Sequence, residues 1–177
     1  MKKISLALTA EPLSEEERAW NRCLQEARSK AIAFLGLSKK PSGQVAARLQ
    51  AQSFSREVIQ AVLAELQADG YLDDYALAKR IIGQRQGRQA EAKSALRRRL
   101  MTKGLAAESV ELALQEASDD RESANALLDQ RFGAELSGMT GETVFQDSTL
   151  QKMARFLMSR GYNPELVEQI LIRRFRH

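Results

Sequence analysis

Gly70-Tyr71-Leu72-Asp73-Asp74 marks a corner between two helices, and the rest of the chain repeats the unit built around it. Glycine readily adopts the left-handed conformation that ends many helices, so Gly70 is expected to close the helix before it. Tyr71 and Leu72 are expected to turn back onto the core. The carboxylates of Asp73 and Asp74 are expected to accept the free N–H groups that open the next helix. The stretch therefore predicts a tight helix-to-helix turn.

Helical periodicity extends from this corner over most of the chain. Behind Asp74, the apolar residues Leu77, Ala78, Ile81 and Ile82 recur at helical spacing, while charged residues take the other directions. The sequence has only 3 prolines and almost no alternating β-branched runs. These features predict an all-α fold.

Apolar residues also align in three copies of one pattern. In each copy a leucine stands five residues before an apolar turn residue, which follows Gly104 in the second copy and Gly161 in the third. More apolar positions follow the turn residue at fixed distances. The aligned sets are Leu49/Leu100/Leu157, Phe54/Leu105/Tyr162, Ile59/Val110/Val167, Val62/Ala113/Ile170 and Leu63/Leu114/Leu171. Self-similarity of this kind is typical of tandem repeats.

Each copy is expected to form three helices, and the copies to stack into an elongated, curved array with an extra N-terminal helical segment. We assign residues 1–23 to an N-terminal lead and the start of the first helix, 24–70 to repeat 1, 71–118 to repeat 2 and 119–177 to repeat 3. Residues 133–147 contain glycines and lack a helical stripe, so they are expected to form a long exposed loop.

Composition limits the partners and the compartment. The 177 residues carry a formal net charge of +4, which favours an anionic partner such as nucleic acid, an acidic protein groove or a membrane surface. Cys23 is the only cysteine, so an intramolecular disulfide is excluded and a reducing cytoplasm fits. No apolar run approaches membrane-spanning length, and we expect a cytoplasmic protein without a membrane partner.

The candidate binding surface is a cluster of cations in repeat 2. A helix turns by about 100° per residue, so three consecutive arginines cannot share a face, and Arg98 points farthest from the stripe of Leu96 and Leu100. Contact with nucleic acid would involve mainly phosphates and would weaken with salt. The candidate residues are Arg85, Arg88, Lys93, Arg97, Arg98, Arg99 and Lys103.

The residue inventory argues against an enzyme. His177, the only histidine, is the last residue, so a histidine-based triad or zinc site is excluded. The segment from Gly87 to Ser94 is one residue from the phosphate-loop pattern, but Ala92 replaces its second glycine and a helix, not a strand, precedes it. We therefore expect no catalytic residue, no metal and no cofactor.

The Gly70–Asp74 corner, the Lys103-Gly104 turn after an arginine-rich helix, and Arg160-Gly161 near the end resemble the RecX family of bacterial recombination regulators. The resemblance implies three tandem three-helix repeats and a protein that regulates, mainly by inhibition, the RecA recombinase in DNA repair, DNA recombination and the SOS response. We separately expect a monomer. Family members bind along the groove of the RecA–DNA filament and reduce its ATPase, strand-exchange and coprotease activities.

This chain departs from the family pattern in repeat 2. Ala92-Lys93 stands where Gly-Pro is common, and Arg99 stands where a glutamate is usual, so the repeat is more cationic. An independent DNA-binding protein of the helix-turn-helix kind, with residues 92–103 as its recognition helix, is the alternative interpretation. A helical scaffold ranks third and an enzyme last.

Overall fold

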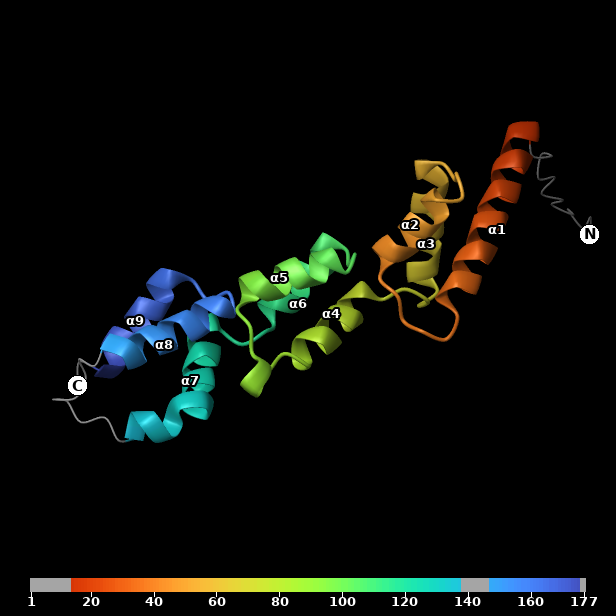
Figure 1. The fold of residues 1–177 in the computed structure, drawn as a ribbon. Helices are drawn as coiled ribbons and strands as arrows, with labels where there is room; N and C mark the ends of the chain where they lie inside the picture. The colour runs from red at the N-terminus through yellow and green to blue at the C-terminus, as the bar shows by residue number, and fades with distance from the viewer. Residues whose placement is uncertain (1–13, 138–146, 176–177) are drawn as a thin grey trace, which may run out of the picture. The chain divides into compact units, whose positions relative to one another are not determined.

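The structure, a computed structural model, describes residues 14–137 and 147–175 (Figure 1). Its regular secondary structure within these ranges is entirely helical, which confirms the predicted all-α class. The helices are α1 (Glu15–Leu35), α2 (Ser42–Gln50), α3 (Arg56–Ala68), α4 (Asp74–Gly83), the 3₁₀ turn η1 (Gly87–Gln89), α5 (Lys93–Thr102), α6 (Ala107–Gln115), α7 (Asp120–Ser137), α8 (Asp147–Ser159) and α9 (Pro164–Phe175). Each of these helices is too short or too polar to cross a bilayer.

The chain divides into two compact units. Unit 1 comprises Met1–Ser38 and Val45–Tyr71, and unit 2 comprises Lys39–Gln44 and Leu72–His177. Predicted repeats 2 and 3 thus fall in one unit, and the division into three repeats stays a prediction. The N-terminal lead before residue 14 and His177 lie outside the described residues.

Unit 1 is held together by α1 and α3. A capping box opens α1: the Glu17 N–H donates to Ser14 Oγ at 3.1 Å, and the Ser14 N–H donates to the Glu17 carboxylate at 2.7 Å. Farther along α1, Arg28 donates to Glu65 at 3.2 Å and to Asp69 at 2.8 Å, at the end of α3. Polar side chains therefore cap the start of α1 and also link α1 to α3.

Within the described residues, unit 2 contains two apolar cores, each formed mainly by three consecutive helices. One core lies among α4, α5 and α6 and includes Leu77, Leu100 and Val110. The other lies among α7, α8 and α9, where Leu157 and Val167 occupy the positions that align with Leu100 and Val110. Burial at aligned positions fits the predicted pattern of three-helix modules.

The corner at residues 70–74 differs from the prediction at one position. Gly70 has a φ of 74°, the left-handed conformation expected of a helix-closing glycine, and Leu72 is buried. Asp73 accepts the Ala76 N–H at 2.8 Å and so caps α4 as predicted. Tyr71, by contrast, is 48% exposed. The expectation that it turns onto the core was wrong, because only one of the two adjacent side chains points inward in the extended segment between Gly70 and the cap.

Asp74 also has a different role from the one predicted. It is the first residue of α4, yet its carboxylate accepts the Ser42 N–H at 2.9 Å, the Ser42 hydroxyl at 2.5 Å and the Ala106 N–H at 2.7 Å. Ser42 opens α2 and Ala106 is the N-cap of α6. The carboxylate therefore caps two neighbouring helices rather than its own, and it does so while only 2% exposed.

A related junction recurs between α5 and α7. The first residue of α7, Asp120, accepts the N–H of Lys93, the first residue of α5, at 2.8 Å. Two turn glycines accept hydrogen bonds beside these junctions: the Gly104 carbonyl accepts the Gly43 N–H at 2.9 Å, and the Gly161 carbonyl accepts the Ser94 hydroxyl at 2.8 Å.

Gly43 and Gly104 illustrate why such a junction needs small residues. A Cβ on Gly43 would lie only 2.6 Å from the Gly104 carbonyl oxygen, closer than van der Waals contact allows. Gly104 itself has a φ of 87°, a conformation that other residues rarely adopt. Gly43 therefore lets the start of α2 approach the turn after α5, and Gly104 adopts the conformation that this turn requires.

The predicted loop at residues 133–147 is partly helical. Helix α7 continues to Ser137 and α8 begins at Asp147, while residues 138–146 lie outside the described residues. The prediction of a loop was wrong for residues 133–137 and for Asp147. A single glycine costs a helix only about 1 kcal/mol, so Gly133 does not suffice to end α7.

We expect Asp74→Ala to lower the free energy of unfolding by about 2–4 kcal/mol, because three partly buried donors lose the acceptor that the buried Asp74 provides. The matched control is Asp73→Ala, which removes one exposed cap and should cost about 1 kcal/mol. Urea denaturation followed by far-ultraviolet circular dichroism measures both. Equal losses in the two variants would contradict the junction role of Asp74.

Candidate anion-binding surface

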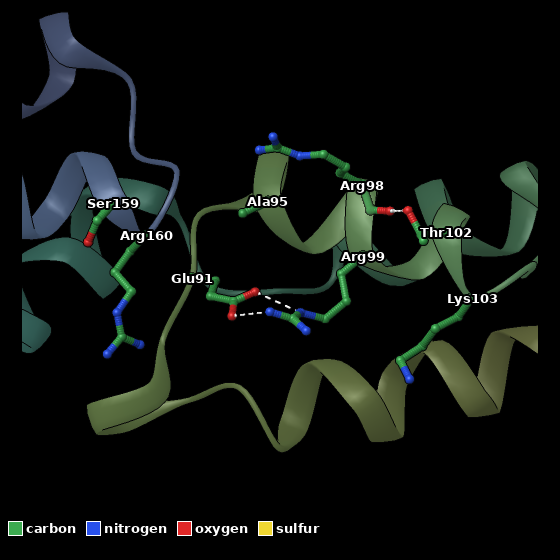
Figure 2. Close-up of a pocket in the computed structure, with 8 residues that line it drawn as sticks. All are labelled: Glu91, Ala95, Arg98, Arg99, Thr102, Lys103, Ser159 and Arg160. Carbon is green, nitrogen blue, oxygen red and sulfur yellow. Dashed lines mark hydrogen bonds and ion pairs between the residues drawn. The ribbon is translucent and has the colours of Figure 1, made fainter.

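Helix α5 presents its three consecutive arginines in three directions. Arg98 is exposed, and no ion pair to it occurs within the described residues. Figure 2 shows its side chain turned away from the pair formed by Arg99 and Glu91. The predicted outward direction of Arg98 is therefore correct, and its guanidinium is available to a partner.

Arg97 is engaged within the unit instead. Its guanidinium donates twice to Glu111 on α6, Nε to Oε1 at 2.5 Å and Nη2 to Oε2 at 2.7 Å. The hydrogen bonds from Arg97 hold the pKa of the Glu111 carboxyl below its ordinary value, and those to Glu111 raise the pKa of Arg97. An anionic partner would have to compete with a bidentate carboxylate for this arginine.

Arg99 forms the second internal pair. It donates to Glu91 through Nε at 3.0 Å and Nη2 at 2.7 Å, and Arg85 approaches the same carboxylate at 3.6 Å. The Glu91 side chain is only 10% exposed. The arginine that departs from the family pattern thus has its charge balanced by a neighbouring glutamate. Hydrogen bonding to Glu91 raises the pKa of Arg99, so the guanidinium stays charged.

A hollow of about 570 Å³ lies beside these side chains. Figure 2 shows the Arg99–Glu91 pair between Arg160 on one side and Lys103 on the other. Glu91 is the only carboxylate that lines the hollow, and its charge is already met by arginines. The full lining is Glu91, Ala95, Arg98, Arg99, Thr102, Lys103, Ser159 and Arg160.

Two further hollows adjoin the first through shared side chains. Lys103 also lines a hollow of about 320 Å³ with Lys39, Lys40 and Arg80, and Arg160 also lines one of about 290 Å³. No carboxylate lines either of them. We call the cations of the three hollows the basic track: Lys39, Lys40, Arg80, Arg88, Arg98, Arg99, Lys103, Arg131 and Arg160.

The seven predicted cations are therefore not one cluster. Arg98, Arg99 and Lys103 share the first hollow and Arg88 lines the third, so four belong to the basic track. The remaining three are Arg97, which faces Glu111, and Arg85 and Lys93, which line a separate hollow that also contains Glu91 and Glu122.

Sequence reasoning missed Lys39, Lys40, Arg80, Arg131 and Arg160 as members of this surface. Arg160 had a signal in the repeat, because it precedes Gly161 as Lys103 precedes Gly104. The others come from separate segments: Lys39 and Lys40 precede α2, Arg80 lies in α4 and Arg131 lies in α7. Their convergence depends on how the helices of unit 2 pack.

The near-match to a phosphate loop has an ordinary structural role. Its glycine, Gly87, opens the 3₁₀ turn η1, and Ala92 is the N-cap of α5. The Lys93 N–H, which would face a phosphate in a true loop, donates to Asp120 instead. Within the described residues, no group of three or more His, Cys, Asp or Glu side chains is arranged to hold a metal ion.

The fold and the cation-lined hollows define an all-α protein suited to bind an anionic partner. No family model matches the chain. The chain is nevertheless similar to several curated proteins. The chain is 26% identical over 147 residues to the regulatory protein RecX of Prosthecochloris aestuarii, covering 83% of this chain and 92% of that protein. It is 27% identical over 154 residues to the regulatory protein RecX of Leptothrix cholodnii, covering 86% and 92%.

Solved structures agree with these relatives. The RecX crystal structure from Lactobacillus salivarius superimposes with a TM-score of 0.65 at 14% identity, over 88% of this chain and 98% of that one. A second crystal structure of a regulatory protein RecX gives a TM-score of 0.59 at 18% identity, over 90% and 78%. These similarities to regulatory proteins RecX confirm the resemblance seen in the sequence.

We expect Arg97→Gln to reduce the acid sensitivity of the protein. The Glu111 carboxyl has a lowered pKa in the folded state, so the pair stabilises the fold at neutral pH and loses this contribution as pH falls through that pKa. The variant lacks the contribution at neutral pH and should lose less stability on acidification. Urea denaturation from pH 7 to about pH 3 measures this. Arg98→Gln is the control, and an identical pH dependence in both variants would contradict the prediction.

Proposed function

We propose that this protein regulates a RecA recombinase, mainly by inhibition, by binding along the groove of the RecA–DNA filament. It reduces the ATPase, strand-exchange and coprotease activities of the filament and is itself no enzyme. The observation that carries the proposal is the similarity to regulatory proteins named RecX over more than four fifths of the chain. A cytoplasmic monomer fits this role.

The basic track supplies the physical means of binding. Its unpaired cations, such as Arg98 and Lys103, would meet acidic side chains of the filament or the phosphates of its DNA. Complementary charge speeds association, and salt screens it. Release of counterions from DNA would add further salt dependence. Binding to the filament is therefore expected to weaken as salt rises.

Repeated modules would raise the affinity for the filament. If residues 24–70, 71–118 and 119–177 act as three modules, each contact with a filament subunit raises the effective concentration for the next. Weak contacts then combine without any single tight site. A protein bound across neighbouring subunits would oppose the relative movement that ATP turnover requires.

The helix-turn-helix alternative has less support from the geometry of α5. A recognition helix presents its N-terminal residues to base edges. Here the Ser94 hydroxyl donates to the Gly161 carbonyl, and a Cβ on Gly161 would lie 2.7 Å from the Ala95 Cβ. The Lys93 N–H is bound to Asp120 as well. The first turn of α5 is therefore packed against its own unit.

One titration separates the two functions. The protein is added to RecA-coated single-stranded DNA while ATP hydrolysis is followed, and its binding to duplex DNA alone is measured at the same salt concentration. We expect hydrolysis to fall with added protein while binding to bare DNA stays weak. Unchanged hydrolysis together with nanomolar duplex binding would favour the alternative.

Variants in α5 connect this effect to the structure. Arg98→Gln removes an unpaired cation from the first hollow and should raise the concentration for half-inhibition by about 3- to 10-fold at low salt. Arg97→Gln should have the smaller effect, since Glu111 already neutralises that arginine. The matched control is Arg22→Gln, which removes an exposed charge from α1. Equal effects of Arg22→Gln and Arg98→Gln would remove the assignment of the surface.

A further inference from the structure

The third hollow of the basic track has a lining unlike the other two. It combines three arginines with two apolar side chains and one amide in about 290 Å³, near the lower end of the range for small-ligand pockets. The lining is Arg88, Leu127, Gln130, Arg131, Phe156 and Arg160. It holds no carboxylate, so its charge is uniformly positive.

Three segments of unit 2 bring these residues together, and Arg160 directly follows the last of them, α8. Arg88 lies in η1, directly after Gly87, whose φ of 58° turns the chain at that point. Gln130 and Arg131 come from α7, and Phe156 comes from α8. The lining residues are far apart in the sequence. The positive charge of the hollow is therefore not simply a run of arginines along a single helix.

Two of the arginines are held by aromatic rings. The Arg131 guanidinium lies over the Phe132 ring at 5.7 Å, and the Arg160 guanidinium lies over the Phe156 ring at 5.4 Å. The two rings contact each other edge to face, with centroids 5.5 Å apart. A guanidinium stacked in this way keeps the N–H donors at its edge free for an anion.

These arginines also lack internal counterions. Within the described ranges, no ion pair engages Arg88, Arg131 or Arg160, whereas Arg97 and Arg99 each have a bidentate glutamate. Unneutralised like charges around one hollow repel each other, and a bound dianion would relieve that repulsion. Phosphate suits guanidinium groups because its oxygens accept paired N–H donors.

We propose that this hollow binds a nucleoside phosphate. The phosphate group is held by Arg88, Arg131 and Arg160. The base lies against the half-buried Phe156 ring and the Arg160 guanidinium that lies over this ring. In this site side chains bind the phosphate. A phosphate loop would instead use the backbone N–H groups between Gly87 and Ser94. The site goes beyond the proposed regulation of RecA, which does not require a nucleotide.

Calorimetric titration of the full chain with thymidine 5′-monophosphate tests the proposal. We expect saturable one-to-one binding that weakens with salt, with thymidine and inorganic phosphate each binding at least about tenfold more weakly, since each lacks half of the contacts. Absence of binding at millimolar nucleotide, or equal binding of inorganic phosphate, would overturn it.

The source of the nucleotide is tested with hexathymidylate carrying a 5′-phosphate or a 5′-hydroxyl. Tighter binding of the phosphorylated strand than of the mononucleotide identifies the end of a nucleic-acid strand as the ligand. Equal binding of the mononucleotide and the phosphorylated strand identifies free nucleotide. Equal binding of the two strands would overturn the proposal, because internal phosphates would then suffice.

Arginine variants locate the binding. Arg131→Gln and Arg88→Gln change exposed side chains, and each should weaken mononucleotide binding about tenfold with helix content unchanged. Arg98→Gln, which changes an unpaired arginine of the first hollow, is the matched control and should leave the affinity unchanged. Equal weakening by all three variants would indicate a diffuse basic surface and would overturn the site.

The two proposals fail separately. Inhibition of RecA without nucleotide binding would overturn only the nucleotide site. Nucleotide binding without inhibition would overturn only the regulatory function.

Discussion

Much of unit 2 depends on one buried carboxylate. Asp74 accepts two N–H groups and a hydroxyl at the starts of α2 and α6 while it opens α4 itself. Helix N-termini carry partial positive charge and free N–H groups, so a single aspartate satisfies several of them at once. Asp120 provides a similar link between α7 and α5. Helix starts joined by acidic residues explain how short helices, each with a small apolar face, are held in a defined arrangement.

Pairing between acidic and basic side chains also decides which cations remain available to a partner. Glu111 and Glu91 each engage an arginine of α5 with two hydrogen bonds, which leaves Arg98 of that run exposed and unpaired within the described residues. Internal pairing therefore decides how strongly each cation of the basic track can act on a partner, and Arg99, which is paired with Glu91, is less available than Arg98. A net charge of +4 describes this surface poorly, because its unpaired cations come from several segments.

Sequence patterns predicted local structure well where that structure depends on residues close together in the sequence. Helical periodicity, the cap at Asp73 and the left-handed Gly70 depend on neighbours along the chain, and all three are observed. The wrong prediction at Tyr71 involved a choice between two equivalent local arrangements. Tyr71 and Leu72 are adjacent apolar residues, and only packing decides which of them is buried.

The sequence by itself determined the all-α class and the apolar columns, because these follow from spacing and composition, and its motifs carried the resemblance to RecX proteins. Only the tertiary structure decided the partners of the charged side chains. Long arginine and glutamate side chains reach residues far away in sequence, so Arg97 meets Glu111, and Arg88 shares a hollow with Arg131, only after the helices have packed. Whether a cation is neutralised or free is therefore a property of the fold and not of its own segment.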